Sequence, residues 1–344
     1  MTDTSKSEAI YMIRHGFFPA PKILQIEITN DCPLACPQCY KTNRQPSYMR
    51  PDVFQKTIDE AEQIGVSLIT LNGGEPLCHP DFVEMVAYAA RRQMLVVTYI
   101  SGFGLNQEYI DRLSGIANLQ LMISMNGSTK EINGLSRDGF SHAVKALERL
   151  AVSDVLFTYA INWVARNDNI DDLQQLLSLA LGHGAKFINV VCNKLTHNGE
   201  IDSPLNKQNY QKLINIIQKN GSCFTIQNCF GMLWAQFIPD HQISQSGCAA
   251  GIRACGVNVD GDYFPCTHLN YVESYPSIMD YWRNSSTLSV LRASSRHIIG
   301  GKCETCLKFE NCRFCHAISM ETYLHLDRGV SDCALYEKRG NLFS

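Results

Sequence analysis

The chain contains no long uncharged apolar run and no signal-peptide pattern, and its first seven residues, Met1 to Ser7, are polar. The missing apolar run predicts that no helix spans a membrane. The missing secretion signal predicts a cytoplasmic protein. Charge of one sign is also lacking, since the net charge is −3. A charge this small creates no field that would attract nucleic acid or an anionic membrane surface, and we expect neither as a partner.

Cysteine, by contrast, is abundant, at 15 of 344 residues. The hydrophobic fraction of 45% and the charged fraction of 18% are typical of a globular protein with a substantial core. The length is sufficient for one large domain and a smaller one. In a reducing cytoplasm, closely spaced cysteines bind metal more often than they form disulfides. The composition therefore predicts a metalloprotein.

From Ile23 to about Val191, short apolar runs alternate with longer amphipathic ones. This alternation favours an α/β fold with a parallel sheet and helical crossovers. Six strand–helix units are recognisable, two fewer than a complete barrel requires. The expected strands are Ile23–Thr29, Ser67–Leu71, Leu95–Ile100, Leu119–Ser124, Val155–Asn162 and Phe187–Val191. The expected helices are Pro51–Ile64, Asp81–Arg92, Gln107–Ile116, Phe140–Ala151 and Asn169–Gly182.

The pattern changes after Leu195. A helix over Asn206–Lys219 and a short strand over Phe224–Gln227 are expected, and from Cys248 onward the chain is rich in cysteine, glycine and aromatic residues. A segment that buries little apolar surface needs another source of stability, and metal clusters are one. We predict three parts: an N-terminal segment (1–22), a barrel (23–235) and a small cysteine-rich domain (236–344).

Three cysteines, Cys32, Cys36 and Cys39, follow the first expected strand at the spacing C-x3-C-x2-C. Thiolate is the soft ligand that iron prefers, so three thiolates can hold three corners of an iron–sulfur cluster. A four-iron cluster would then keep one iron without a protein ligand, and an open position is typical of catalytic metal sites. A structural zinc site is the alternative, although zinc normally takes four protein ligands.

This stretch resembles the cluster-binding loop of the radical S-adenosylmethionine (radical SAM) enzymes. The resemblance implies a partial (β/α)6 barrel and a [4Fe-4S] cluster whose open iron binds S-adenosylmethionine (SAM). It also implies cleavage of SAM to a 5′-deoxyadenosyl radical that abstracts hydrogen from an unactivated carbon, with electrons from a reductant such as flavodoxin or ferredoxin. Gln38 stands where the family usually has an aromatic residue that lies against the adenine.

The second and third expected strands end in further parts of this resemblance. Gly73-Gly74-Glu75 matches the family's GGE motif, whose backbone and acid hold the amino group of SAM. Paired glycines also let the backbone approach a ligand closely. Ser101 begins a small polar turn at a place where the family contacts adenosine. The resemblance therefore assigns these four residues to SAM, although a plain loop at Ser101 is an open alternative.

The fourth and fifth expected strands supply the remaining candidates for SAM binding. Ser124 and Arg137 match a family pattern in which serine contacts the methionyl or ribose part and arginine contacts the carboxylate. Arginine suits that role because it can bind a carboxylate with two parallel hydrogen bonds. Asn126 replaces the usual aspartate of this pattern, and Asn162 ends the fifth strand, where it could reach the ribose.

Eight cysteines in the last hundred residues resemble the SPASM extension of radical SAM enzymes, and eight thiolates suffice for two [4Fe-4S] clusters. The hook of C-x2-C units ends one residue short of the usual spacing before Cys315. The resemblance assigns Cys248, Cys255, Cys266 and Cys315 to a first auxiliary cluster. It assigns Cys303, Cys306, Cys312 and Cys333 to a second, which makes three clusters in total. Two zinc sites of the ribbon kind are the alternative.

Four cysteines have no place in these clusters: Cys78, Cys192, Cys223 and Cys229. Buried cysteine is usually a small hydrophobic residue. Cys192, however, directly follows the sixth expected strand, and the mouth of such a barrel lies at the carboxyl ends of its strands. We hypothesise that Cys192 is catalytic and returns a hydrogen atom to a substrate radical, as an epimerase would require.

The sequence leaves more than one class of substrate open. SPASM enzymes most often modify ribosomally made peptides by crosslinking, epimerisation or oxidation, and we expect such a peptide first. Thr267-His268 after Cys266 counts against the sulfatase-maturing type, which carries an acidic residue there. A small molecule such as an aminocyclitol sugar is the second possibility. A zinc-stabilised binding protein without catalytic activity is the alternative from another class.

Overall fold

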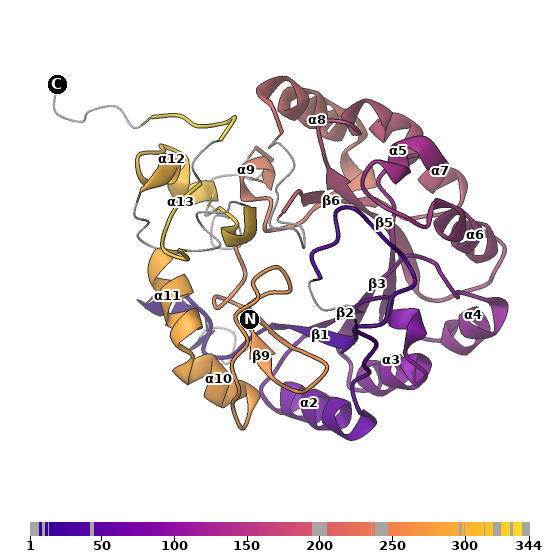
Figure 1. Ribbon diagram of the computed structural model, residues 1–344, viewed down its shortest axis with the longest axis horizontal. Coiled ribbons are helices and arrows are strands. Elements are labelled where there is room, and N and C mark those ends of the chain that lie inside the picture. The colour runs from indigo at the N-terminus through magenta and orange to yellow at the C-terminus, as the bar shows by residue number, and fades with distance from the viewer. Residues whose placement is uncertain are drawn as a thin grey trace.

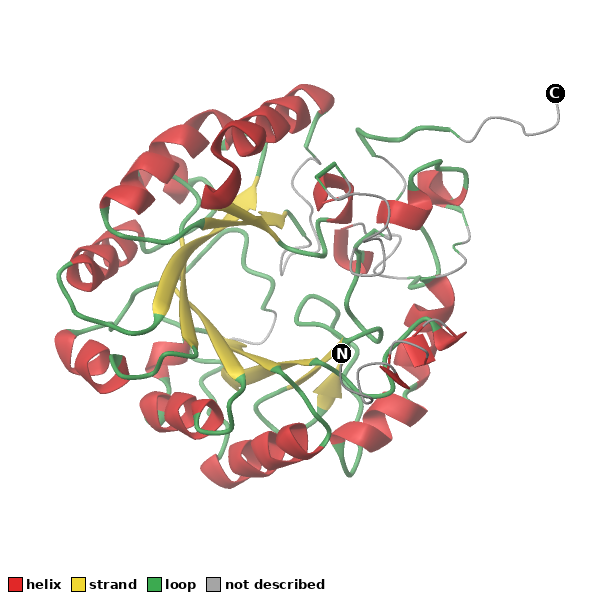
Figure 2. Cartoon of the chain, turned by 180° about the vertical axis from the view of Figure 1, so that it is seen from behind, coloured by secondary structure: helices red, strands yellow, loops and turns green. Residues whose placement is uncertain are grey.

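The computed structural model describes residues 7–8, 11–12, 14–41, 45–194, 205–234, 236–237, 247–295, 298, 300–312, 314–318, 325–330 and 333–338. In this part of the chain, a curved nine-stranded sheet has the order β7-β6-β5-β4-β3-β2-β1-β8-β9. Helices cover its convex side, and the concave side faces the middle of the molecule (Figures 1 and 2). This arrangement confirms the α/β class and the incomplete parallel barrel.

The strands are β1 (Ile23–Thr29), β2 (Leu68–Gly73), β3 (Leu95–Ile100), β4 (Leu119–Ser124), β5 (Thr158–Ala165), β6 (Ile188–Cys192), β7 (Phe224–Ile226), β8 (Ala254–Val257) and β9 (Tyr263–Phe264). Strands β1 to β7 pair in parallel, in sequence order. β8 pairs in parallel with the other side of β1, and β9 pairs antiparallel with β8. The bounds of β1, β3 and β4 are those expected from the sequence. Each of the other expected strands differs from the observed one by at most three residues at either end.

The helices are α2 (Pro51–Gln63), α3 (Phe82–Ala90), α4 (Gln107–Leu113), α5 (Lys130–Gly134), α6 (Phe140–Ala151), α7 (Leu173–Gly182), α8 (Lys207–Asn220), α9 (Gly231–Trp234), α10 (Ile278–Asn284), α11 (Ser286–Ser294), α12 (Gly301–Glu304) and α13 (Phe309–Cys312). Local chemistry sets several starts: Pro51 occupies the first turn of α2, and Asn106 and Asn206 cap α4 and α8. No helix in the described part of the chain is long and apolar enough to cross a bilayer.

The two faces of the sheet carry different side chains because residues alternate along each strand. On the convex side, Leu24, Ile26 and Ile28 of β1 belong to a large core that includes helix residues such as Phe54. On the concave side, Val97, Met122 and Ala160 form a small separate apolar group. Polar side chains of the concave side stand nearer the carboxyl ends of the strands, where the candidate site lies.

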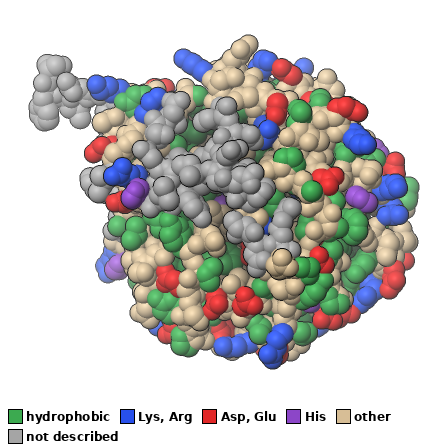
Figure 3. All heavy atoms as spheres, in the orientation of Figure 1, with side chains coloured by type: hydrophobic (Ala, Val, Ile, Leu, Met, Phe, Trp, Pro, Cys, Tyr) green, Lys and Arg blue, Asp and Glu red, His purple; other side chains and the backbone are tan. Residues whose placement is uncertain are grey.

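The cysteine-rich region adds to the barrel on both sides of its opening. β8 and β9 extend the sheet beyond β1, while α12 and α13 lie on the far side of the opening, near α9 (Figure 1). The backbone N–H of Ile278 donates to Glu60 of α2 over 3.1 Å, which ties α10 to the barrel. Acidic and basic side chains are interspersed on the face drawn in Figure 3.

Candidate active site

Cys32, Cys36 and Cys39 lie on the loop that follows β1, and all three are partly buried. The backbone N–H of Gln38 donates to the carbonyl of Ser136 over 3.1 Å, which attaches this loop to the turn after α5. Burial raises the pKa of the Cys32 thiol to about 11, and the negative charges of Glu75, Cys36 and Cys39 add to this effect. Thiolates that repel one another in this way gain stability from bound metal, so the donor set fits an iron–sulfur cluster.

The two glycines at the end of β2 hold this loop through the backbone. The N–H of Gly74 donates to the carbonyl of Thr29, and the N–H of Glu75 donates to the carbonyl of Asp31, each over 2.7 Å. A Cβ on Gly73 would lie 2.0 Å from the Thr29 oxygen, and one on Gly74 would lie 2.0 Å from the Asp31 oxygen. Gly73 also has φ of 141°, which side chains disfavour. Only glycine permits this approach.

Glu75 is almost fully buried beside this contact. One carboxylate oxygen accepts from the backbone N–H of Ser101 over 2.7 Å and from the Ser101 hydroxyl, and the other accepts from the N–H of Leu77 over 3.3 Å. Burial raises the pKa of Glu75 to about 7, although these hydrogen bonds and the charge of Arg137 oppose the rise. Ser101 therefore positions the acid from the end of β3.

Arg137 brings a positive charge to the same mouth, and its Nε is buried with no hydrogen-bond partner among the described residues. A buried donor without a partner is costly unless a ligand satisfies it. Glu75 and Arg137 thus offer a carboxylate and a guanidinium that complement the ammonium and carboxylate of an amino acid, which is the methionyl end of SAM. This complementarity is the fit of the site to SAM.

Ser124, at the end of β4, lies opposite Asn162, on the side of the sheet that faces the opening. Asn162 does not end the fifth strand as expected, because β5 continues to Ala165. The side-chain oxygen of Asn162 accepts from Asn189 of β6 over 2.8 Å, and Asn189 accepts from Thr225 of β7 over 3.1 Å. The structure thus places Ser124 on the same rim as Glu75 and Ser101, and it gives Asn162 a protein partner.

The two departures from the family pattern, Gln38 and Asn126, contact each other. The Asn126 amide donates to the Gln38 oxygen over 2.9 Å and to Ser136 over 2.8 Å, while its oxygen accepts from the N–H of Val164 over 3.1 Å. Asn126 is fully buried. It therefore connects the cysteine loop to β5 by hydrogen bonds, where the sequence suggested only a contact with SAM.

Four C-terminal cysteines, Cys303, Cys306, Cys312 and Cys333, line one pocket together with apolar residues such as Phe309. Cys303 accepts from the N–H of Val330 over 3.3 Å. The Cys333 sulfur lies 3.0 Å from the sulfur of Met232 on α9, which also lines the pocket. Four thiols around one apolar pocket fit the donor set expected for the second auxiliary cluster.

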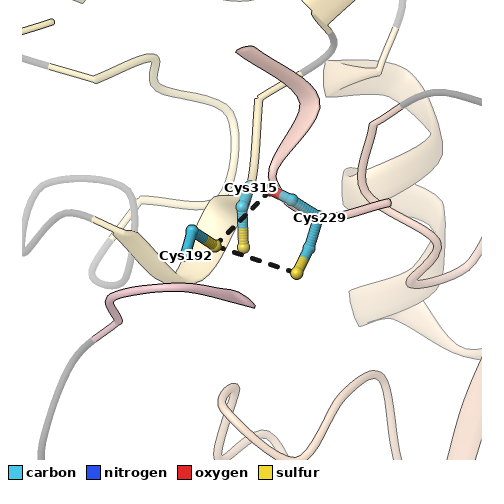
Figure 4. A group of neighbouring side chains, drawn as sticks. All are labelled: Cys192, Cys229 and Cys315. Atoms are coloured by element: carbon cyan, nitrogen blue, oxygen red, sulfur yellow. Dashed lines mark hydrogen bonds between the residues drawn. The ribbon is translucent and has the colours of Figure 1, made fainter. Parts of the chain in front are cut away.

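A second group of thiols lies between this pocket and the barrel. The sulfur atoms of Cys192, Cys229 and Cys315 all lie within 4.8 Å of one another and converge on one point (Figure 4). Burial raises the pKa of Cys248 to about 12, and the negative charges of Cys266 and Cys229 contribute to the rise. Cys229 follows β7 and belongs to no C-x2-C unit, so no spacing in the sequence predicts its place in this group.

Two sequence-based candidates lie elsewhere than expected. Cys255 pairs with Leu24 in the β1–β8 register and is fully buried on the convex side of the sheet, whereas the residue after Cys266 contacts Gln25 on the opposite face. Cys192 is buried in a core that also includes Cys315. Its neighbours are two thiols, a placement that gives the hydrogen-donor hypothesis no support.

Comparison with known proteins agrees with the geometry. Residues 26–180 match the radical SAM superfamily. Mycofactocin maturase MftC of Mycobacterium tuberculosis is 28% identical over 91% of this chain and 83% of its own length. The PqqA peptide cyclase of Ruegeria pomeroyi is 24% identical over 88% and 84%, and the AdoMet-dependent heme synthase of Methanosarcina barkeri is 26% identical over 87% and 92%.

A solved structure extends the likeness to the whole fold. SuiB of Streptococcus suis, bound to S-adenosylmethionine, superposes with a TM-score of 0.75 over 91% of this chain and 77% of its own, at 15% identity. The likeness therefore spans the barrel and the cysteine-rich region, and at this identity it concerns the fold alone.

The glycine contact generates a first prediction. Gly74→Ala places a Cβ against the Asp31 carbonyl, so we expect the free energy of unfolding to fall by about 1–3 kcal/mol and the iron bound by the cysteine loop to decrease. Gly115→Ala is the matched control because a Cβ there meets nothing within 4 Å. Chemical denaturation and iron analysis of both variants test this, and equal behaviour would contradict it.

Glu75 generates a second prediction, on pH. Its pKa is raised in the fold, so burial costs nothing below the unfolded pKa of 4.5, and stability falls as pH rises toward the folded pKa of about 7. Between pH 5 and 8, the free energy of unfolding of the wild type should fall by about 2–3 kcal/mol more than that of Glu75→Gln. Parallel pH dependences in urea titrations would show that Glu75 is not the responsible group.

Asn126 generates a third prediction. Asn126→Ala leaves the buried N–H of Val164 without its acceptor, so we expect a loss of about 1–3 kcal/mol in unfolding free energy. Gln38→Ala removes one hydrogen bond but leaves Asn126 bound to Ser136 and Val164, and we expect a loss below about 1.5 kcal/mol. Thermal and urea denaturation measure both variants. A larger effect of Gln38→Ala would reverse the assigned roles.

Proposed function

We propose that this chain, whose residues 26–180 match the radical SAM superfamily, is a radical SAM enzyme that abstracts a hydrogen atom from an unactivated carbon of a ribosomally made peptide. The observation that carries the proposal is the three-cysteine loop held against Gly73 and Gly74, next to the oppositely charged pair Glu75 and Arg137. Three thiolates leave one iron of a four-iron cluster open, and the charged pair complements the ligand that would bind it.

Each residue of the rim has a distinct task in this proposal. When bound, the cluster on the cysteine loop supplies the electron that cleaves SAM to a 5′-deoxyadenosyl radical. Glu75 accepts from the amino group of SAM, and Ser101 holds the acid in place. Arg137 binds the carboxylate through its Nε, which has no hydrogen-bond partner among the described residues. Ser124 at the end of β4, and Asn162 opposite it on β5, border the remaining space.

We also propose three [4Fe-4S] clusters in total. Support for the second auxiliary cluster comes from the pocket shared by Cys303, Cys306, Cys312 and Cys333. The first auxiliary site is supported by the thiols that gather around Cys315. These clusters would take up or deliver an electron as the substrate radical is quenched, and a reductant such as flavodoxin or ferredoxin would supply the SAM-binding cluster.

A peptide is the favoured substrate because two relatives matched over most of this chain are named for peptide chemistry or maturation: the PqqA peptide cyclase and mycofactocin maturase. The second candidate is oxidation of a small molecule, and the AdoMet-dependent heme synthase favours it, since it matches over a similar length. The peptide and small-molecule candidates differ in the size of the molecule that loses the hydrogen atom. A labelling experiment can determine that size.

That experiment follows the abstracted hydrogen. Extract from cells grown on deuterated amino acids is separated by size into peptides and small metabolites, and each fraction is incubated anaerobically with the reconstituted enzyme, SAM and dithionite. Deuterium in 5′-deoxyadenosine, read by mass spectrometry, should come from the peptide fraction. The variant Cys32→Ala/Cys36→Ala/Cys39→Ala should form no 5′-deoxyadenosine.

Each contrary result removes a different part of the proposal. Deuterium from the metabolite fraction alone would replace the peptide with a small molecule. No 5′-deoxyadenosine from the wild type, with zinc in place of iron, would contradict the enzyme and leave a zinc-stabilised binding protein.

A further inference from the structure

Cys229 belongs to the thiol group next to the barrel, with Cys192 and Cys315. Its sulfur lies 3.8 Å from that of Cys192 and within 4.8 Å of that of Cys315 (Figure 4). It reaches this place from the loop between β7 and α9, where it accompanies Gln227, whose side-chain oxygen lies 2.9 Å from the Cys229 sulfur. Cys229 therefore lies beside Cys315, which is 86 residues further along the chain. No cysteine spacing in the sequence predicts this contact.

Two further thiols face the same group. Cys248 accepts hydrogen bonds from the N–H groups of Ala250 and His316, so it lies beside the residue that follows Cys315. Cys266 lies on the concave side of the sheet, where the N–H of the next residue, Thr267, donates to Gln25 over 3.2 Å. Together, Cys229, Cys248, Cys266 and Cys315 form a complete set of thiolate ligands.

Lys194 provides an independent observation, since a buried cation needs an anionic partner. The residue is 8% exposed, and its Nζ lies 3.4 Å from the Gln227 oxygen. The same Gln227 oxygen lies 2.9 Å from the Cys229 sulfur, so the buried ammonium lies beside the thiol group. A buried ammonium next to thiols points to a site that carries negative charge, as a thiolate-ligated cluster does.

Cys255, the fourth ligand expected from the family pattern, faces the other way. It shares the convex side of the sheet with Leu24, its partner in the β1–β8 register. On the concave side, the neighbouring Gln25 accepts from the N–H of Thr267, which follows Cys266. Adjacent residues of a strand point to opposite faces, so the sheet itself separates Cys255 from Cys266. The charge that reaches Cys255 is instead that of Arg292.

We propose that Cys229 is the fourth ligand of the first auxiliary iron–sulfur cluster, together with Cys248, Cys266 and Cys315, and that Cys255 is a buried thiol outside it. The proposal rests on the proposed function in that the chain holds iron–sulfur clusters. Cys192 is a neighbour of the site, since its sulfur lies 3.8 Å from that of Cys229.

The test uses the full chain in the background Cys32→Ala/Cys36→Ala/Cys39→Ala, which keeps the two auxiliary sites and cannot cleave SAM. Iron, acid-labile sulfide and zinc are measured after anaerobic reconstitution, and EPR spectra are recorded after reduction and after mild oxidation. The background should bind about eight irons. Adding Cys229→Ala should remove about one to four of them and give a three-iron EPR signal on oxidation, whereas adding Cys255→Ala or Cys192→Ala should leave about eight.

Other results overturn the assignment. Loss of iron from the Cys255→Ala or Cys192→Ala protein, with far-ultraviolet circular dichroism unchanged, would return the fourth ligand to that residue, even if Cys229→Ala failed to fold. Zinc in place of iron would show a mononuclear site, whose thiolates lie roughly 3.8 Å apart for a 2.3 Å bond. Because no readout depends on SAM cleavage, an inactive wild type would contradict the proposed function without affecting this assignment.

Discussion

The backbone contact between the cysteine loop and the end of β2 is the constraint on which the rest of the site depends. Two carbonyls, of Thr29 and Asp31, accept from consecutive N–H groups of Gly74 and Glu75, at a separation that leaves no room for a Cβ. The same contact places Glu75 beneath the loop, so that its negative charge reaches Cys32. Loop, acid and strand end therefore behave as one rigid unit, which suits a site that must orient a ligand on an open iron.

Buried charge organises the mouth of the barrel in a second way. Glu75 and the thiols of three separate groups are withdrawn from water, and a buried anion needs a cation or hydrogen-bond donors nearby. Arg137 has this role beside Glu75, and Lys194 has it among Cys192, Cys229 and Cys315. Tyr40 and His268, whose ring centroids lie 4.5 Å apart, connect the cysteine loop to the residues that follow Cys266. The cysteine loop and the residues after Cys266 thus lie next to each other.

The sequence predicted the parts of the fold that local pattern determines. Apolar runs predicted the strands β1 to β6, because each of these strands is buried on both faces of a parallel sheet. The spacing of Cys32, Cys36 and Cys39 predicted the cysteine loop. The β8–β9 hairpin was missed because its strands are short and lie among glycines. Two features depend on tertiary pairing: the contact of Gln38 with Asn126, 88 residues away, and the face on which Cys255 points, which the β1–β8 register decides.

The most direct measurement of the central claim is electron–nuclear double resonance on the reduced enzyme with SAM labelled by ¹⁵N in its amino group and ¹⁷O in its carboxylate. If SAM binds the open iron, we expect hyperfine coupling of both labels to the cluster on Cys32, Cys36 and Cys39. We expect no coupling in the variant that lacks these three thiols. Normal cluster content without coupling to either label would contradict an open iron that binds SAM.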